Sequence, residues 1–453
     1  MLFILRKVWA LLLTPVLLLT GASLLVMDLA GEDAIAATRW DYVYDNDRLL
    51  LGAYCYDPAF SDPAYIGQVK DAGLDFLICD TTPAFMDECG RQGVGVIASH
   101  YNAPAMYGDV SDGGKAQWMN LSAEGYQKHP ALWGDNVIDE PSARSFRAIS
   151  DILGHYYALD TGRLPMINLF PIYADSDQLG NEPQLGSLRY LLPGTAYADE
   201  SLDKYRRHTA DYIKTIDTDY ISVDIYPYGL DGTNDAWLHN LDILAEACRG
   251  TGRDLWVITQ AAGNEVDEGG GMRWCSTKPD QLQQSYASLA FGAKAVVYAC
   301  YQTGWWDDGS HMVNAAGETT DTYDAVRAVN EELRVFAETY GEYSWLGAYT
   351  VNSYKAAGLR YELANGLPKQ ERLRLNSWDG LLVGCFDQKD GDGKAYVIVN
   401  MMELLHEKTA RLTVEFPENT PVTLYVGGIP TAFEGGRREI MLAPGEGVFV
   451  TVG

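Results

Sequence analysis

Basic residues are scarce in this sequence. Its 453 residues include 34 Lys and Arg against 62 Asp and Glu, which gives a net charge of −28. A field of this sign repels the phosphates of nucleic acids and of anionic membranes, so nucleic acid is not an expected partner. It decides little for an uncharged ligand, and the composition is therefore compatible with a neutral substrate.

Several motifs that bind cofactors or carry nucleophiles are also missing. The seven cysteines are scattered, with no CxxC pair and no tight Cys/His cluster. This argues against a disulfide framework and a structural zinc site. The absence of a GxGxxG motif, a phosphate loop and a GxSxG elbow disfavours dinucleotide binding and Ser-His-Asp hydrolysis. The sequence predicts no cofactor and no metal.

Charge is missing from one long segment near the N-terminus. Arg6 and Lys7 precede an uncharged apolar stretch from Trp9 to Met27, and Ala34-Ile35-Ala36 offers a small-x-small cleavage site. This arrangement predicts an export signal over residues 1–37 and is compatible with bacterial secretion. The stretch is also nearly long enough to remain as a membrane anchor. We therefore expect an extracytoplasmic protein that is secreted or tethered to a membrane.

Short apolar runs alternate with segments of helical period between residues 38 and 345. The pattern is typical of parallel strands joined by crossover helices. Eight such units over about 300 residues match an α/β fold, the (β/α)8 TIM barrel, with a doubly wound open sheet as the alternative. The predicted strands are Leu49–Tyr56, Asp75–Cys79, Val94–Ser99, Trp133–Asp139, Pro165–Leu169, Tyr220–Tyr226, Leu255–Gln260 and Ala293–Tyr301.

The helix predicted from Ser142 onwards illustrates the segments between the strands. Ser142 can cap it, and Phe146, Ile149, Leu153 and Tyr156 fall on one face. Further helices are predicted at 201–216, 235–249, 278–291 and 322–340.

The residue pattern of the sequence changes after the last predicted helix. From residue 346 to 453, short β-rich runs are separated by turn residues. This composition predicts a small all-β sandwich domain that follows the barrel.

Polar and aromatic residues gather at the predicted strand ends, where barrels of this class carry their active sites. Carboxylates and rings are frequent there and Lys and Arg are nearly absent. This combination favours an uncharged oligosaccharide or polysaccharide whose sugar rings stack on Trp and Tyr. The alternative is that the rings belong to the core and that acids such as Asp139 cap helices. The candidate site residues are Asp80, His100, Asn102, Asp139, Glu140, Asp224, Tyr226, Gln260, Glu265, Tyr301, Trp305 and Trp306.

Three motifs occur in a familiar order. Asp139-Glu140-Pro141 ends the fourth predicted strand, Asp-Ile-Tyr-Pro at 224–227 ends the sixth, and YACYQTGWW ends the eighth. In this order the sequence resembles glycoside hydrolase clan A, the retaining (β/α)8 hydrolases, and especially its β-galactosidase-like members with a C-terminal β-sandwich. The resemblance covers roughly residues 49 to 450, mostly as architecture, and implies that Glu140 is the acid/base residue.

Two positions depart from the pattern of the clan. Asp139 replaces the asparagine before the acid/base glutamate, so a hydrogen bond to a sugar hydroxyl would need reversed polarity. Gln260 stands where the clan has its nucleophilic glutamate, and an amide cannot act as that nucleophile. The second carboxylate is therefore expected from Asp224 or from the loop after the seventh strand, which contains Glu265, Asp267 and Glu268.

Hydrolysis of a glycosidic bond requires a protonated carboxyl as acid and an ionised carboxylate as base or nucleophile. We predict Glu140 as the acid, with a pKa raised by its enclosed position and by Asp139, and Asp224 as its partner. The sequence leaves retention and inversion open. A competing hypothesis, suggested by Gln260, is a non-catalytic carbohydrate-binding protein; a surface structural protein would lack acids at the mouth. His100 is expected to form a pocket wall rather than to act as a base.

Overall fold

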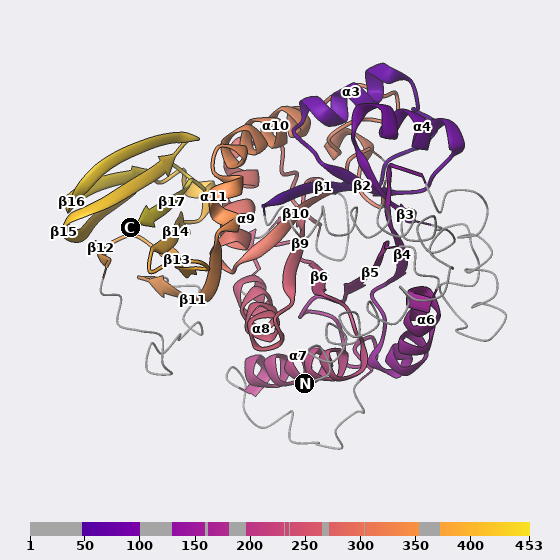
Figure 1. The fold of residues 1–453 in the computed structure, drawn as a ribbon, viewed down its shortest axis with the longest axis horizontal. Coiled ribbons are helices and arrows are strands. Elements are labelled where there is room, and N and C mark those ends of the chain that lie inside the picture. Colours follow the sequence, from indigo (N-terminus) through magenta and orange to yellow (C-terminus); the bar gives the residue numbers. More distant parts are fainter. Residues whose placement is uncertain are drawn as a thin grey trace, which may run out of the picture.

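The computed structural model describes residues 48–99, 129–158, 162–180, 196–230, 232–234, 236–264, 271–302, 304–352 and 372–453. Eight parallel strands close into a barrel in the order β1-β10-β9-β6-β5-β4-β3-β2 (Figure 1). Each strand overlaps one that the sequence predicts, so the (β/α)8 barrel is confirmed and the open sheet is excluded. The strands are β1 Leu50–Tyr54, β2 Phe76–Cys79, β3 Gly95–Ser99, β4 Leu132–Asp139, β5 Leu164–Leu169, β6 Tyr220–Asp224, β9 Asp254–Gln260 and β10 Ala293–Ala299.

Aromatic rings fill one end of the barrel interior. The ring centroid of Phe76 lies 5.7 Å from that of Trp133 and 5.5 Å from that of Trp256. Glycines make room for these rings: a Cβ on Gly52 would lie 2.4 Å from the Phe76 ring, and one on Gly95 would lie 2.2 Å from the Trp133 ring. Because the three rings come from the first halves of their strands, open space is left at the carboxyl ends.

Helices pack around the barrel with their apolar faces inward. In α6, the residues predicted to share one face, Phe146, Ile149, Leu153 and Tyr156, are all buried. The predicted cap is wrong, because the hydroxyl of Ser142 makes no capping hydrogen bond and a short 3-10 turn precedes the helix. The helices are α3 Pro63–Asp71, α4 Pro83–Gln92, α6 Phe146–Ala158, α7 Ala196–Thr215, α8 Ala236–Thr251, α9 Lys278–Ala290, α10 Asp321–Arg334 and α11 Ala337–Gly341.

An antiparallel sheet of seven strands forms the C-terminal part, which confirms the predicted all-β unit. The strands form one continuous sheet in the order β11-β13-β14-β17-β15-β12, with β16 beside β15. The predicted boundary at residue 345 falls inside the first of these strands. They are β11 Tyr343–Val351, β12 Arg374–Ser377, β13 Leu381–Gln388, β14 Lys394–Asn400, β15 Ala410–Val426, β16 Ile429–Leu442 and β17 Gly447–Val452.

The two faces of this sheet have different partners. One face, with Phe386, Val397 and Phe449, belongs to the same apolar cluster as the barrel helices. The other face surrounds a core of its own, to which both halves of the long strand β15 contribute. In Figure 1 the sheet, coloured gold, lies beside α9 and α11. The sheet is thus packed directly against the barrel.

Gly384 is expected to tolerate no side chain at the contact between sheet and barrel. A Cβ there would lie 2.2 Å from the carbonyl oxygen of Ala290, at the end of α9. Gly384→Ala should therefore lower the free energy of unfolding by about 1–3 kcal/mol, as overpacking does. Gly154→Ala is the control, because a Cβ on this helical glycine meets nothing within 4 Å. It should raise stability by about 0.5–1 kcal/mol. Equal effects in thermal unfolding would contradict the predicted close contact.

Within the described ranges, no helix is both long enough and apolar enough to cross a membrane. The predicted signal or anchor at 1–37 lies outside those ranges.

Candidate active site

One asparagine joins two carboxylates at the carboxyl end of the barrel. Asp139 ends β4, Asn168 lies on β5 and Asp224 ends β6, three neighbouring strands. The amide nitrogen of Asn168 donates to Oδ1 of Asp139 at 3.1 Å and to Oδ1 of Asp224 at 2.7 Å. The hydroxyl of Ser222 donates to the amide oxygen of Asn168 at 2.9 Å and fixes its orientation. The two carboxylates therefore lie within two hydrogen-bond lengths of each other.

Glu140 follows Asp139 in an unusual backbone conformation. Its φ is +47°, in the left-handed region that a residue with a side chain rarely adopts. Its backbone N–H donates to the carbonyl oxygen of Asn168 at 2.9 Å, which holds the turn in place. Conformations of this kind cluster at functional sites, where the surrounding structure stabilises them. Asp139 and Glu140 both line the same cavity as a result.

The cavity has a volume of about 360 Å³. Trp305 forms an exposed part of its wall, with 51% of its surface accessible. Trp306, which the sequence also predicts as a sugar contact, is not among the lining residues; it meets Tyr226 edge-on, with ring centroids 4.7 Å apart. A lining of carboxylates and aromatic rings suits a ligand with hydroxyl groups and apolar ring faces. The lining residues are Tyr54, Asp139, Glu140, Asn168, Tyr173, Asp224, Tyr226, Ile258 and Trp305.

The three acids differ in how readily they ionise. Burial, followed by the charges of Asp224 and Asp139, raises the pKa of Glu140 to about 9. Burial and the charge of Asp139 raise the pKa of Asp224 to about 7, against the hydrogen bond from Asn168. Burial raises the pKa of Asp139 to about 6, and the same amide again opposes it. At neutral pH Glu140 therefore keeps its proton, while the pair on Asn168 holds negative charge.

The site should reduce stability at alkaline pH, and Glu140→Gln should relieve this. Folded Glu140 keeps its proton up to about pH 9, whereas the unfolded residue loses it near the ordinary value of 4.5. The wild type therefore loses stability as the pH rises through this window. The glutamine does not titrate, so we expect its Tm to exceed that of the wild type by a few degrees at pH 8 and by less at pH 5. A difference in Tm that stays constant over this range would contradict the raised pKa.

Gln260 ends the seventh strand of the barrel as predicted, but it does not line the cavity. It is fully buried. Its amide oxygen accepts from the backbone N–H of Tyr228 at 2.9 Å, and its amide nitrogen donates to the carbonyl oxygens of Tyr228 and Arg273. The predicted sugar contact is therefore wrong, because both polar atoms of the side chain are hydrogen-bonded to backbone groups of two neighbouring loops.

Besides Gln260 and Trp306, two further predicted contacts do not line the cavity. Tyr301 is 1% exposed and packs against Tyr56 in the core, with ring centroids 5.3 Å apart. Its side chain lies in the main apolar cluster, outside the barrel interior to which the preceding Cys300 belongs. Asp80 follows β2 and is partly exposed, but it is not among the residues that line the cavity.

Three predicted site residues, His100, Asn102 and Glu265, lie outside the described residues, as do Asp267 and Glu268.

The structure adds three polar residues, Tyr54, Asn168 and Tyr173, and the apolar Ile258 to the predicted set. Tyr54 ends β1, Asn168 lies one residue before the end of β5, and Tyr173 lies in the segment after it. The rule that strand ends form the site could have found all three. In the part of the chain that the structure describes, no group of three or more His, Cys, Asp and Glu residues is arranged to hold a metal ion.

No protein-family model matches the sequence, and no curated protein matches it. Solved structures with a similar fold include a β-galactosidase from Marinomonas ef1, at 12% identity and a TM-score of 0.43, over 65% of this chain and 60% of that one. A family 5 glycoside hydrolase from Bacteroides vulgatus matches at 11% identity and a TM-score of 0.46, over 89% of each chain.

An endo-β-1,4-mannanase from Thermotoga petrophila matches at 8% identity and a TM-score of 0.39, over 87% of this chain and 97% of that one. Because the identities are this low, the function proposed below rests on the residues of the site.

Proposed function

We propose that this protein is a glycoside hydrolase that cleaves O-glycosidic bonds with Glu140 and Asp224. The observation that carries the proposal is one cavity that contains a carboxyl with a strongly raised pKa beside two carboxylates held on one amide. Hydrolysis of a glycosidic bond needs this combination of a proton donor and an ionised partner.

In this proposal Glu140 donates its proton to the oxygen of the leaving sugar as the bond to the anomeric carbon breaks. The ionised Asp224 acts at the anomeric carbon, either as the nucleophile or as the base that takes a proton from the attacking water. Asn168 holds Asp224 in place. Both roles of Asp224 leave Glu140 as the acid, and the anomeric form of the first product, read by NMR, distinguishes them.

The substrate in this proposal is an uncharged oligosaccharide or polysaccharide. Tyr226 and Trp305 offer rings for sugar faces, and no Lys or Arg is among the described lining residues. An anionic sugar would meet the charge of Asp139 and Asp224 with no compensating cation among those residues. We further propose that the protein works outside the cytoplasm, on the basis of the N-terminal segment.

A panel of aryl glycosides and of plant and host glycans tests the proposal. Purified protein should release aryl alcohol or new reducing ends from at least one neutral substrate. Gln260, which replaces the expected nucleophile, favours the competing function, a carbohydrate-binding protein without catalysis. Sugar-dependent quenching of tryptophan fluorescence with no hydrolysis on the whole panel would reject the hydrolase and support the binder.

A further inference from the structure

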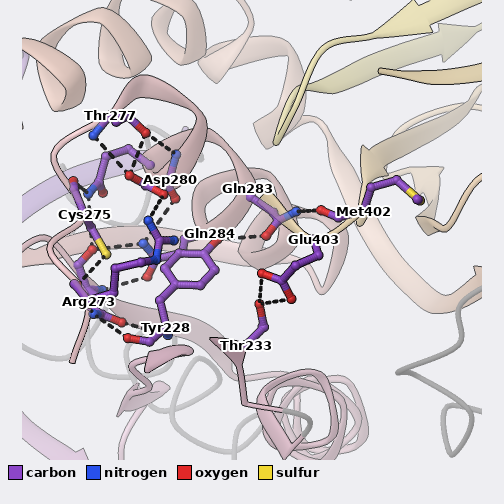
Figure 2. A network of polar contacts seen from close by, with 12 residues as sticks. Tyr228, Thr233, Arg273, Cys275, Thr277, Asp280, Gln283, Gln284, Met402 and Glu403 are labelled. Carbon is purple, nitrogen blue, oxygen red and sulfur yellow. Dashed lines mark hydrogen bonds and ion pairs between the residues drawn. The ribbon is translucent and has the colours of Figure 1, made fainter. Parts of the chain in front are cut away.

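Tyr228 is one of two residues that connect the loop of the proposed site to the C-terminal part of the chain. It lies four residues after Asp224 and two after Tyr226, both of which line the cavity. Its backbone is held by Gln260 on both sides, through N–H and carbonyl oxygen. Its ring lies beneath the guanidinium of Arg273, with 4.7 Å from the guanidinium carbon to the ring centroid. Figure 2 shows Arg273 over the ring of Tyr228.

The Arg273 and Gln260 contacts are in turn anchored on α9. Arg273 forms an ion pair with Asp280 at 2.7 Å, and Asp280 completes a capping box with Thr277 at the start of the helix. Gln284 accepts from the backbone N–H of Gln260 at 2.8 Å and donates to its carbonyl oxygen at 2.9 Å. The seventh strand and the site loop are therefore fixed to the helix that packs against the C-terminal sheet.

The sheet itself supplies the next contacts. The hydroxyl of Tyr228 donates to Gln283 at 2.9 Å, and the amide of Gln283 donates to the carbonyl oxygens of Asn400 and Met402, at 3.0 and 3.1 Å. One residue further, both carboxylate oxygens of Glu403 accept from the hydroxyl of Thr233 at 3.1 Å. Figure 2 shows the two connections side by side.

Thr233 belongs to a small hairpin within the site loop. Its two strands are β7 Tyr228–Gly229 and β8 Gly232–Thr233. Gln283 and Glu403 thus hold the two strands of this hairpin, at Tyr228 and Thr233, which pair with each other. Leu404 packs with Tyr228 and Cys275 in a small buried cluster. The end of β14 and the segment that follows it, residues 400–404, therefore contact the loop whose first residues face the cavity.

We propose that the 400–404 segment is a positioning element of the site, which holds Tyr226 and Asp224 through Gln283, Glu403 and the hairpin. The C-terminal part of the chain then helps to position the residues of the site. The expected effect on the rate of hydrolysis rests on the proposed function. The hydrogen bonds between the 400–404 segment and the loop do not depend on that function.

A double-mutant cycle on Thr233 and Glu403 tests the link. Thr233→Val and Glu403→Ala each remove one partner of the same contact, so the double variant should be no worse than either single one. Each should speed amide hydrogen exchange in peptides that cover 225–234 by about tenfold, as expected for the loss of a hydrogen bond to a charged group. Gln283→Leu should do the same through the other connection.

Glu415→Ala is the matched control, because Glu415 is a half-exposed acid of the same sheet whose carboxylate pairs with Arg374 on the neighbouring strand β12. It should leave exchange at 225–234 unchanged. On a glycoside that the wild type hydrolyses, Glu403→Ala should lower kcat more than it raises KM, and Glu403→Gln, which keeps an acceptor oxygen, should restore most of the rate.

Exchange at 225–234 that does not differ between Glu403→Ala and Glu415→Ala would overturn the inference, as would additive effects in the cycle. If the wild type hydrolyses nothing on the panel, the proposed function fails, but the exchange experiment still decides whether the sheet holds the loop.

Discussion

Glu140→Gln is expected to lower the rate of hydrolysis by about 10²–10⁴-fold, the usual contribution of a general acid. The size of the loss should depend on the leaving group. An aryl alcohol of low pKa leaves without a proton, so its release should be little affected, whereas a sugar leaving group requires the proton of Glu140. Steady-state kinetics on an activated aryl glycoside and on the matching disaccharide measure the difference.

Binding provides the control for this variant. The amide that Glu140→Gln introduces has nearly the size of the carboxylic acid it replaces, so the dissociation constant for a product sugar should change little. A loss of kcat/KM of the same size on both leaving groups would contradict the role of Glu140 as proton donor, because kcat/KM reports the step in which the leaving group departs. A parallel loss of sugar binding would indicate a damaged cavity instead.

The strands of the barrel could be predicted from the sequence because both of their faces are buried. All residues of β1, β2, β3 and β6 are buried, so each strand appears as a continuous apolar run with clear ends. The strand ends then point to the site, and Asp139, Glu140, Asp224 and Tyr226, which are selected on this ground, line one cavity.

The direction in which a side chain points was harder to predict. Gln260 lies at the expected place, yet its amide is oriented by Tyr228 and Arg273, which are 32 and 13 residues away in sequence. Tyr301 follows β10, where one step along the chain changes the face. Asn168 is neither an acid nor a ring, and its role exists only because β4, β5 and β6 are neighbours in the closed barrel. Such contacts depend on the assembled fold.

Asp224→Asn should cost about as much activity as the loss of the acid, about 10²–10⁴-fold, and should do so with every leaving group. The reason is that the ionised partner acts at the anomeric carbon and not on the leaving oxygen. The structure favours Asp224 over Asp139 for this role. Asp224 has the shorter hydrogen bond to Asn168. The charge of Asp224 also raises the pKa of Glu140 more than the charge of Asp139 does.

The pH profile separates the two aspartates. Activity requires ionised Asp224 and protonated Glu140, so the wild type should be most active between the two pKa values, about 7 and about 9. Because the charge of Asp139 raises the pKa of Asp224, Asp139→Asn should move the acidic limb to lower pH and keep most of the maximal rate. If instead Asp139→Asn abolishes hydrolysis and Asp224→Asn only shifts the limb, the roles are exchanged: Asp139 is the partner of Glu140, and Asp224 tunes it.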